Sequence, residues 1–183
     1  MSDSALIEYC SPTLAGLKTG SLFTVACGDK DILLKEIAQM NRQYACRGLR
    51  VIPLGYTRSR ALIYIYRPSL LKKDFGDALA ARILDERGYA TGNADKCVAQ
   101  LVARLRAAGE FPHEIGLFLG YPPEDVEGFI AHRDDGCKYV GTWRVYGDEV
   151  SARKKFADYR MCTISYERQF SRGKKLLDLI VAT

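Results

Sequence analysis

The chain has 183 residues and a mass of 20.5 kDa, which is the size of one domain. Apolar residues make up 48% and charged residues 27%, which excludes a disordered, collagenous or disulfide-stapled chain. The net charge of +5 is concentrated in residues 132–183, which carry 11 basic and 7 acidic side chains. We therefore expect one globular domain over residues 1–183, with a mildly basic C-terminal segment.

The cysteines and the N-terminus indicate a cellular compartment. Six cysteines lie far apart, at positions 10, 27, 46, 97, 137 and 162, and none forms a C-x-x-C pair. The N-terminus lacks the basic start and apolar run of a signal peptide. No segment approaches the roughly 18 apolar residues of a membrane span. We therefore expect a cytoplasmic protein that does not contact membranes and whose thiols are reduced.

The first 48 residues predict two helices around one strand. Residues 4–9 are expected to form a short helix that Ser11-Pro12 ends, because the residue before a proline avoids the helical region. A buried strand over 21–27 lies between two glycines. A helix then runs from Asp29 or Asp31 to about Cys46. Its apolar stripe consists of Leu33, Ile37, Met40 and Tyr44.

The strongest strand pattern predicts a hairpin. Arg50–Tyr56 and Ala61–Arg67 flank a polar turn, and apolar or aromatic residues occupy both faces of the second strand. That strand is therefore expected to be covered on both sides, with Leu62, Ile63 and Ile65 buried. Pro53 cannot donate to a ladder, so the first strand is expected at an edge or bulged there.

The middle of the chain predicts helices. Helical patterns cover 75–87, 94–108, 113–119 and 122–131, with Asn93 as the N-cap of the second.

The C-terminal part predicts one strand and one long helix. Thr142–Tyr146 reads as a strand, and a helix opens at Gly147-Asp148 and continues to about Ser171. Residues 176–181 either add a last turn or dock loosely. The fold class is therefore α+β, with about four strands in a small, mostly antiparallel sheet and about six helices. The stripe of the long helix consists of Phe156, Tyr159, Thr163, Tyr166 and Phe170.

Four stretches together resemble a known family. They are CSPTLAGLKTGSLF at 10–23, EFPHEIGLFLGYPPEDVEGFI at 110–130, CKYVGTWRVYGD at 137–148 and KKFADYRMC at 154–162. They are similar to a bacterial domain-of-unknown-function family, number 3793, typical of anaerobic Gram-positive bacteria. The resemblance spans nearly the whole chain and implies a free-standing bacterial protein. It implies no activity, ligand or catalytic residue.

The spacing of the metal-ligating residue types argues against a metal site. A structural zinc site uses close pairs such as C-x₂-C. The candidate ligands Cys10, Cys137, Cys162 and His113 are not paired in this way, and His132 lies in a polar run. We therefore predict no metal site and leave the cofactor open.

Cysteine chemistry is one open alternative. A cysteine and a distant histidine can form a catalytic dyad. Cys10 and Cys162 are the candidate nucleophiles, and His113, next to Glu114 at a helix start, is the candidate base. No local signature of a nucleophile turn accompanies either cysteine.

Two possible motifs are rejected, a phosphate-binding loop and a DNA-binding helix-turn-helix. The segment 15–21 has glycines and Lys18 before a strand, whereas phosphate cradles follow a strand and precede a helix. Residues 113–131 have the spacing of a helix-turn-helix, but the second helix carries Glu124, Asp125 and Glu127, which DNA phosphates would repel. These patterns favour a turn and a packing unit, and they argue against DNA as a partner.

The basic C-terminal helix is the second open alternative. It is either the solvated face of an amphipathic helix or the surface of an RNA-binding module. The residues concerned are Arg153, Lys154, Lys155, Arg160, Arg168 and Arg172, followed by Lys174-Lys175.

The leading hypothesis is an accessory protein that binds a small ligand, a cofactor or a protein partner. Its site is expected where segments 10–18, 113–121 and 137–146 converge. The candidate ligand-binding residues are Cys10, Lys18, His113, Tyr121, Cys137, Trp143 and Tyr146.

Overall fold

The computed structural model describes residues 1–107, 111–133 and 135–182, and it has the predicted α+β architecture. A three-stranded antiparallel sheet contains β1 (Gly20–Ala26), β2 (Arg50–Tyr56) and β3 (Arg60–Tyr66), in the order β1-β3-β2. A separate hairpin pairs β4 (Tyr139–Val140) with β5 (Arg144–Val145). The helices of the described part are α1 (Asp3–Leu14), α2 (Lys30–Tyr44), the 3₁₀ turn η1 (Ala45–Arg47), α3 (Pro68–Asp74), α4 (Ala78–Glu86), α5 (Ala94–Arg106), α6 (Ile115–Phe118), α7 (Pro123–His132), α8 (Glu149–Ser171) and α9 (Leu176–Leu179).

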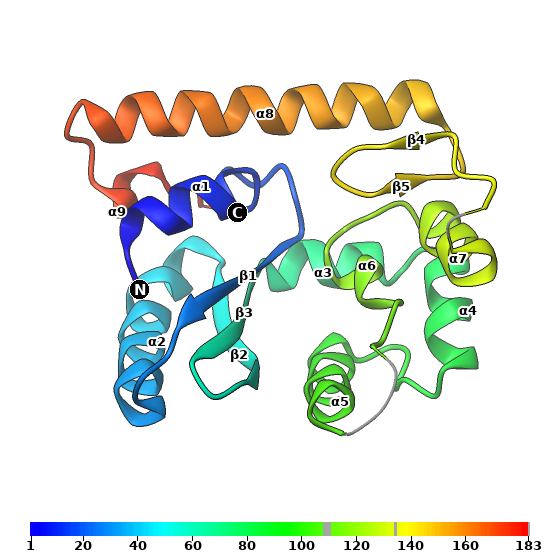
Figure 1. Ribbon diagram of the computed structural model, residues 1–183, viewed down its shortest axis with the longest axis horizontal. Coiled ribbons are helices and arrows are strands. Elements are labelled where there is room, and N and C mark those ends of the chain that lie inside the picture. Colours follow the sequence, from blue (N-terminus) through cyan, green and yellow to red (C-terminus); the bar gives the residue numbers. More distant parts are fainter. Residues whose placement is uncertain (108–110, 134, 183) are drawn as a thin grey trace.

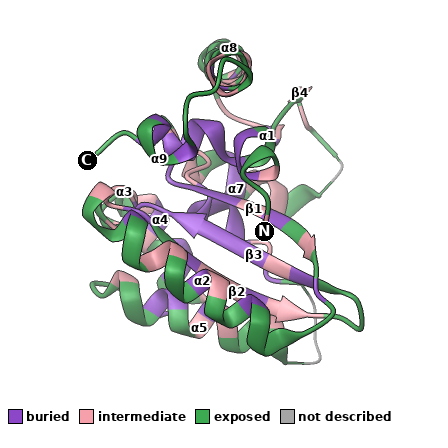
Figure 2. Ribbon diagram, turned by 90° about the vertical axis from the view of Figure 1, so that its left-hand side faces the viewer, coloured by how far each residue is buried: buried purple, intermediate pink, exposed green. Residues whose placement is uncertain are grey.

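Both faces of β3 are covered, as its sequence predicts. Ile63 and Ile65 pack with α1, α2 and α9, whereas Tyr64 and Tyr66 pack with α3 to α7 on the opposite face. Ile63 and Ile65 are buried, although Leu62 is only half-buried. Figure 2 shows the buried β3 between its two less buried neighbours. The alternation of side chains along this central strand therefore divides the main core into two clusters.

The predictions for β2 and the helix caps are confirmed. β2 is an edge strand, and its register shifts between Pro53 and Gly55. Side chains of Asp29, Asn93 and Asp148 accept hydrogen bonds from the first turns of α2, α5 and α8. These N-caps can be predicted from sequence because each capping side chain bonds to amides within a few residues of it.

The prediction that Ser11-Pro12 ends the first helix is wrong. α1 continues through Pro12 to Leu14, and its buried side chains pack against the sheet and α8. The Ser11 hydroxyl donates to the Ile7 carbonyl, and the Pro12 carbonyl accepts from the Leu17 and Lys18 amides. A proline in the last turn removes only one helical hydrogen bond, and the burial of this turn offsets that loss.

The segment between β3 and α5 also differs from its prediction. α4 forms within the helix expected at 75–87, although it begins three residues later, and α3, which precedes it, is not predicted by the sequence analysis. Pro68 occupies the first turn of α3, and the Asp77 carboxylate caps α4 by accepting from the Leu79 and Ala80 amides. Proline at a helix start and aspartate at an N-cap are the signals that set these boundaries.

The long helix α8 lies along one side of the molecule (Figure 1). Its N-terminal half passes over the β4–β5 hairpin, and its C-terminal half passes over α1 and α9. Of the predicted stripe only Tyr166 is buried, because α8 covers the core from outside. The C-terminal segment does not dock loosely, since Leu176, Leu179 and Ile180 are buried in the core.

Candidate functional site

A cavity of about 320 Å³ opens between α6, α7 and the β4–β5 hairpin. Aromatic and aliphatic side chains form most of its wall, and three of the predicted residues, His113, Tyr121 and Trp143, line it together. The described lining residues are Phe111, His113, Ile115, Gly116, Tyr121, Asp125, Val126, Phe129, Trp143 and Arg144. We call this cavity the aromatic pocket.

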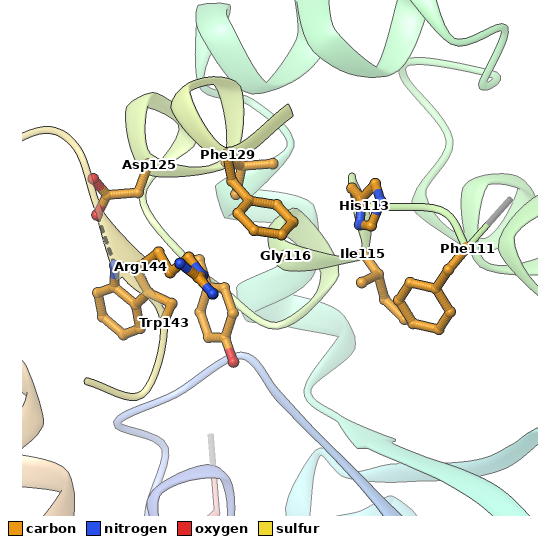
Figure 3. A pocket seen from close by; sticks show the side chains of 10 residues that line it. Phe111, His113, Ile115, Gly116, Asp125, Phe129, Trp143 and Arg144 are labelled. Atoms are coloured by element: carbon orange, nitrogen blue, oxygen red, sulfur yellow. Dashed lines mark hydrogen bonds between the residues drawn. The ribbon is translucent and has the colours of Figure 1, made fainter. Parts of the chain in front are cut away.

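Asp125 fixes the hairpin against α7. Its carboxylate is 3% exposed and accepts from the Trp143 indole Nε1 at 2.7 Å, which Figure 3 draws as a dashed line. The same carboxylate accepts from the backbone amides of Tyr146 and Gly147, each at 2.7 Å. Hydrogen bonds to a carboxylate are stronger than those between neutral groups. The first bond therefore orients the Trp143 indole, and the other two hold the backbone at the end of the hairpin. The carboxylate that sequence alone placed on a DNA-repelling surface is therefore an internal anchor.

Stacked rings continue from Trp143 in two directions. Tyr121 stacks on the indole with centroids 4.8 Å apart, and Phe156 of α8 meets it edge-on at 4.4 Å. Offset-stacked and edge-to-face pairs of this kind add about 0.5–1.5 kcal/mol each beyond their area burial. Burial raises the pKa of the Tyr121 phenol to about 12, so this ring stays neutral. The pocket therefore has one rigid aromatic wall.

His113 and Arg144 bring polar groups to an otherwise apolar pocket. The His113 ring lies edge-on to Phe129, with centroids 5.2 Å apart. In Figure 3, Phe129 lies between His113 and Arg144, which belong to opposite sides of the pocket. A mostly apolar cavity with a few convergent polar groups is the usual form of a small-molecule site.

Gly116 allows α6 to approach the pocket closely. A Cβ built on this residue would lie 2.8 Å from Val126 Cγ2 and 3.2 Å from Tyr121 Cδ2. Real Cβ atoms essentially never lie as close as 2.8 Å to another heavy atom, so a side chain here would push the Val126 side chain of α7 away and press against Tyr121. Glycine is therefore required where the backbone meets the aromatic wall.

The predicted segment 10–18 reaches this region through one residue. The Lys18 amino group lies over the Tyr121 ring, with its Nζ 5.3 Å from the ring centroid. Burial lowers the pKa of Lys18 to about 8, although the nearby Cys10 acts in the opposite direction. Lys18 does not line the aromatic pocket, although it contacts the Tyr121 ring, which does.

Neither candidate nucleophilic cysteine lies in the pocket. Cys10 lies on the buried face of α1, within the core, and burial raises the pKa of its thiol to about 12. Cys162 on α8 is half-buried, and burial raises the pKa of its thiol to about 11. Both shifts reduce the thiolate fraction, which is the nucleophilic form.

The carboxylate of Glu114, which follows the candidate base His113 in the chain, belongs to a different cluster. The Glu114 carboxylate is buried on the other side, where it accepts from the Tyr89 hydroxyl at 2.9 Å. Arg87 and Arg104 approach the same carboxylate at 3.6 and 3.8 Å. Burial, followed by the Glu114 charge, raises the pKa of Tyr89. This cluster ties α5 to α6 and is separate from the aromatic pocket.

The remaining candidates lie at the edges of the hairpin. The Cys137 thiol donates to the Tyr139 carbonyl, and the Tyr146 hydroxyl donates to the Arg133 carbonyl. Tyr146 lines another hollow together with His132. In the described ranges, no group of three or more His, Cys, Asp or Glu side chains could hold a metal ion. No helix in those ranges is long and apolar enough to cross a bilayer.

Comparison with known proteins assigns the sequence to a family. The sequence profile described as "Protein of unknown function (DUF3793)" matches residues 6–180. The chain belongs to the DUF3793 family. No curated protein and no solved structure matches it. The matched region of this DUF3793 protein includes every residue that lines the aromatic pocket.

Sequence reasoning missed much of the pocket wall of this DUF3793 protein. The sequence analysis uses Asp125 only as an acidic residue that DNA would repel, although its side chain is buried in the structure. Ile115, Val126 and Phe129 resemble ordinary helix core residues, and no local signal distinguishes them. Arg144 could have been found, because it stands in the predicted strand between the apolar neighbours Trp143 and Val145.

Proposed function

We propose that this DUF3793 protein binds a small, flat organic ligand in the aromatic pocket and acts as an accessory binding protein. The observation that carries this proposal is the rigid aromatic wall, in which Asp125 holds Trp143 against Tyr121 beside an open volume of about 320 Å³. A volume at the lower end of the range for ligand sites suits one or two fused rings.

The chemistry of the wall supports binding rather than covalent catalysis. Of the described residues that line the pocket, none is a cysteine, serine, threonine or lysine. The Asp125 carboxylate is engaged by three donors, so it positions the hairpin instead of exchanging protons. His113 and Arg144 supply hydrogen-bonding groups that suit a carbonyl or carboxylate oxygen on the ligand.

The test uses intrinsic fluorescence, because Trp143 is the only tryptophan of the chain. A panel of indole, flavin, nucleobase and aromatic carboxylate compounds is titrated into the native protein at constant ionic strength. Saturable quenching or a spectral shift by at least one flat compound is expected. A Phe129→Ala variant should weaken that binding, whereas an exposed control, Glu127→Ala, should not. If no flat compound changes the Trp143 emission, the proposal is wrong.

A second candidate function, RNA binding, rests on the exposed basic residues of α8. Lys154, Arg160 and Arg168 are all exposed, although Arg153 is engaged by Glu149 at 2.7 Å. Phosphate binding by such residues would fall steeply with salt. A Lys154→Ala/Arg168→Ala double variant should then keep its melting temperature but lose affinity for single-stranded RNA and its salt dependence. Equal weak binding by both proteins would reject this candidate.

A further inference from the structure

A second hollow lies on the other side of Tyr121, beneath the N-terminal half of α8. Two cavities of about 270 and 410 Å³ share the residues Lys73, Asp74, Gly120 and Lys155, so they adjoin, and we treat them together as one groove. Lys18 lines the smaller of the two cavities. We call it the lysine groove, defined by Lys18, Lys73 and Lys155. It is distinct from the aromatic pocket and does not depend on the function proposed there.

Lys18 differs from every other lysine of the chain. The other ten lysines are exposed, whereas Lys18 is half-buried. Among the described residues, no oxygen accepts a hydrogen bond from its amino group, and its neighbours are the face of the Tyr121 ring and the Cys10 thiol. A partly buried ammonium without an acceptor is unfavourable for stability. Packing therefore gives no reason for a lysine at this position.

The groove provides charged and proton-carrying groups around this amine. Lys73 of α3 and Lys155 of α8 stand on its walls as exposed cations. Asp74, which accepts from the Thr19 hydroxyl, and Tyr159 line the same space, and Asp158 lies at the exposed edge. Burial raises the pKa of Asp74, and it raises the pKa of Tyr159 to about 12, so the Tyr159 phenol stays protonated at neutral pH.

We propose that the Lys18 amine forms an imine with the carbonyl carbon of a small aldehyde that carries an anionic group, held by Lys73 and Lys155. The amine lone pair attacks the carbonyl carbon and forms a C–N bond. The carbonyl oxygen then leaves as water together with the two amine hydrogens, and a C=N bond remains. The reaction needs no oxidant or reductant, and added water reverses it.

The environment of Lys18 favours this reaction at neutral pH. An amine is nucleophilic only when neutral, and desolvation is the usual means of obtaining a neutral lysine. Burial lowers the pKa of Lys18 to about 8. At pH 7.5 about a quarter of the Lys18 amine is then neutral, against roughly one part in a thousand for an exposed lysine.

The test is reductive trapping in the native full-length protein. The protein is mixed at pH 7.5 with an equimolar amount of pyridoxal 5′-phosphate, which serves only as an aldehyde probe with an anionic group. Borohydride then converts any imine to a stable secondary amine, and peptide mass spectrometry locates it. We expect Lys18 to be modified at least about tenfold more than exposed Lys154. Modification that follows exposure, with Lys18 the least modified, would overturn the proposal.

Variants separate the amine from the anion-holding lysines. Lys18→Arg should abolish the saturable modification, whereas the matched control Lys154→Arg should leave it unchanged. A Lys73→Met/Lys155→Met double variant should weaken binding of the phosphate-bearing probe at least about fivefold, while unphosphorylated pyridoxal should react equally with both proteins. Saturable modification that persists in Lys18→Arg would contradict the assignment. Because the first experiment uses unchanged protein, a variant that fails to fold does not affect it.

Discussion

Replacement of Asp125 by alanine would remove the anchor of the aromatic wall. The side chain is buried, and three donors from Trp143, Tyr146 and Gly147 would lose their acceptor. A buried donor without a partner costs about 1–3 kcal/mol. Tyr146 and Gly147 are only half-buried, so water replaces part of what their amides lose. We therefore expect Asp125→Ala to lower the free energy of unfolding by about 3–5 kcal/mol.

Asp125→Asn is a milder form of the same perturbation. An asparagine keeps one oxygen for the Tyr146 and Gly147 amides, but its NH₂ group then faces the Trp143 indole N–H. Two donors facing each other leave one indole hydrogen bond unmade, so we expect a loss of about 1–3 kcal/mol. Glu127→Ala on the same helix is the control, because it breaks only the exposed pair with Arg82 and should cost about 0–1 kcal/mol.

The assay is urea unfolding followed by far-ultraviolet circular dichroism, with the emission of Trp143 as a local probe. For a chain of this length, a loss of about 4 kcal/mol lowers Tm by roughly 8–16 °C. The native emission of the alanine variant should also move to longer wavelength, because the indole loses its anchored, buried position. An Asp125→Ala protein that unfolds within about 0.5 kcal/mol of wild type would refute this role of the carboxylate.

Four further outcomes follow from burial. Phe156→Ala should cost about 2–4 kcal/mol by urea unfolding, because the ring contacts Trp143 but is only half-buried, whereas exposed Lys154→Ala should cost under about 0.5 kcal/mol. Ile63→Asp should cost several kcal/mol, and a mutant with the wild-type melting temperature would contradict its central position. Lys18→Met should be more stable than wild type below pH 8. That advantage should shrink between pH 8 and about 10.5, because the unfolded chain then binds more protons at Lys18; a constant difference across this range would contradict the lowered pKa. A thiol reagent should modify exposed Cys46 first in native protein and all six thiols after denaturation without reductant, and a total of two or four would indicate disulfides.

The parts of the fold that sequence predicts are those determined by nearby residues. The hairpin of β2 and β3 follows from alternation over a few positions, and the caps of α2, α5 and α8 follow from one side chain each. Tertiary packing overrides the local signal in α1, where the buried final turn retains Pro12. The stripe of α8 gives the direction that Phe156 and Tyr166 face, but not their depth, since depth depends on what lies beneath the helix.

The candidate site is predictable only in part, for the same reason. Aromatic residues in two segments pointed to His113, Tyr121 and Trp143, which the fold places on one cavity. The hydrogen bond between Asp125 and Trp143 joins residues 18 positions apart, and no periodic pattern in the sequence predicts it. Cys10, in contrast, is a candidate for its chemistry alone, and its place on the buried face of α1 is a property of the folded chain.

The most direct test of the proposed binding function is the indole N–H signal of Trp143 in a ¹⁵N–¹H correlation spectrum. The chain has one tryptophan, so this signal is assigned without ambiguity. If the aromatic pocket is the binding site, a library of flat aromatic fragments should contain compounds that shift this signal saturably, and Phe129→Ala should weaken the shift. Flat fragments that bind the protein while the indole signal stays in place would contradict the account.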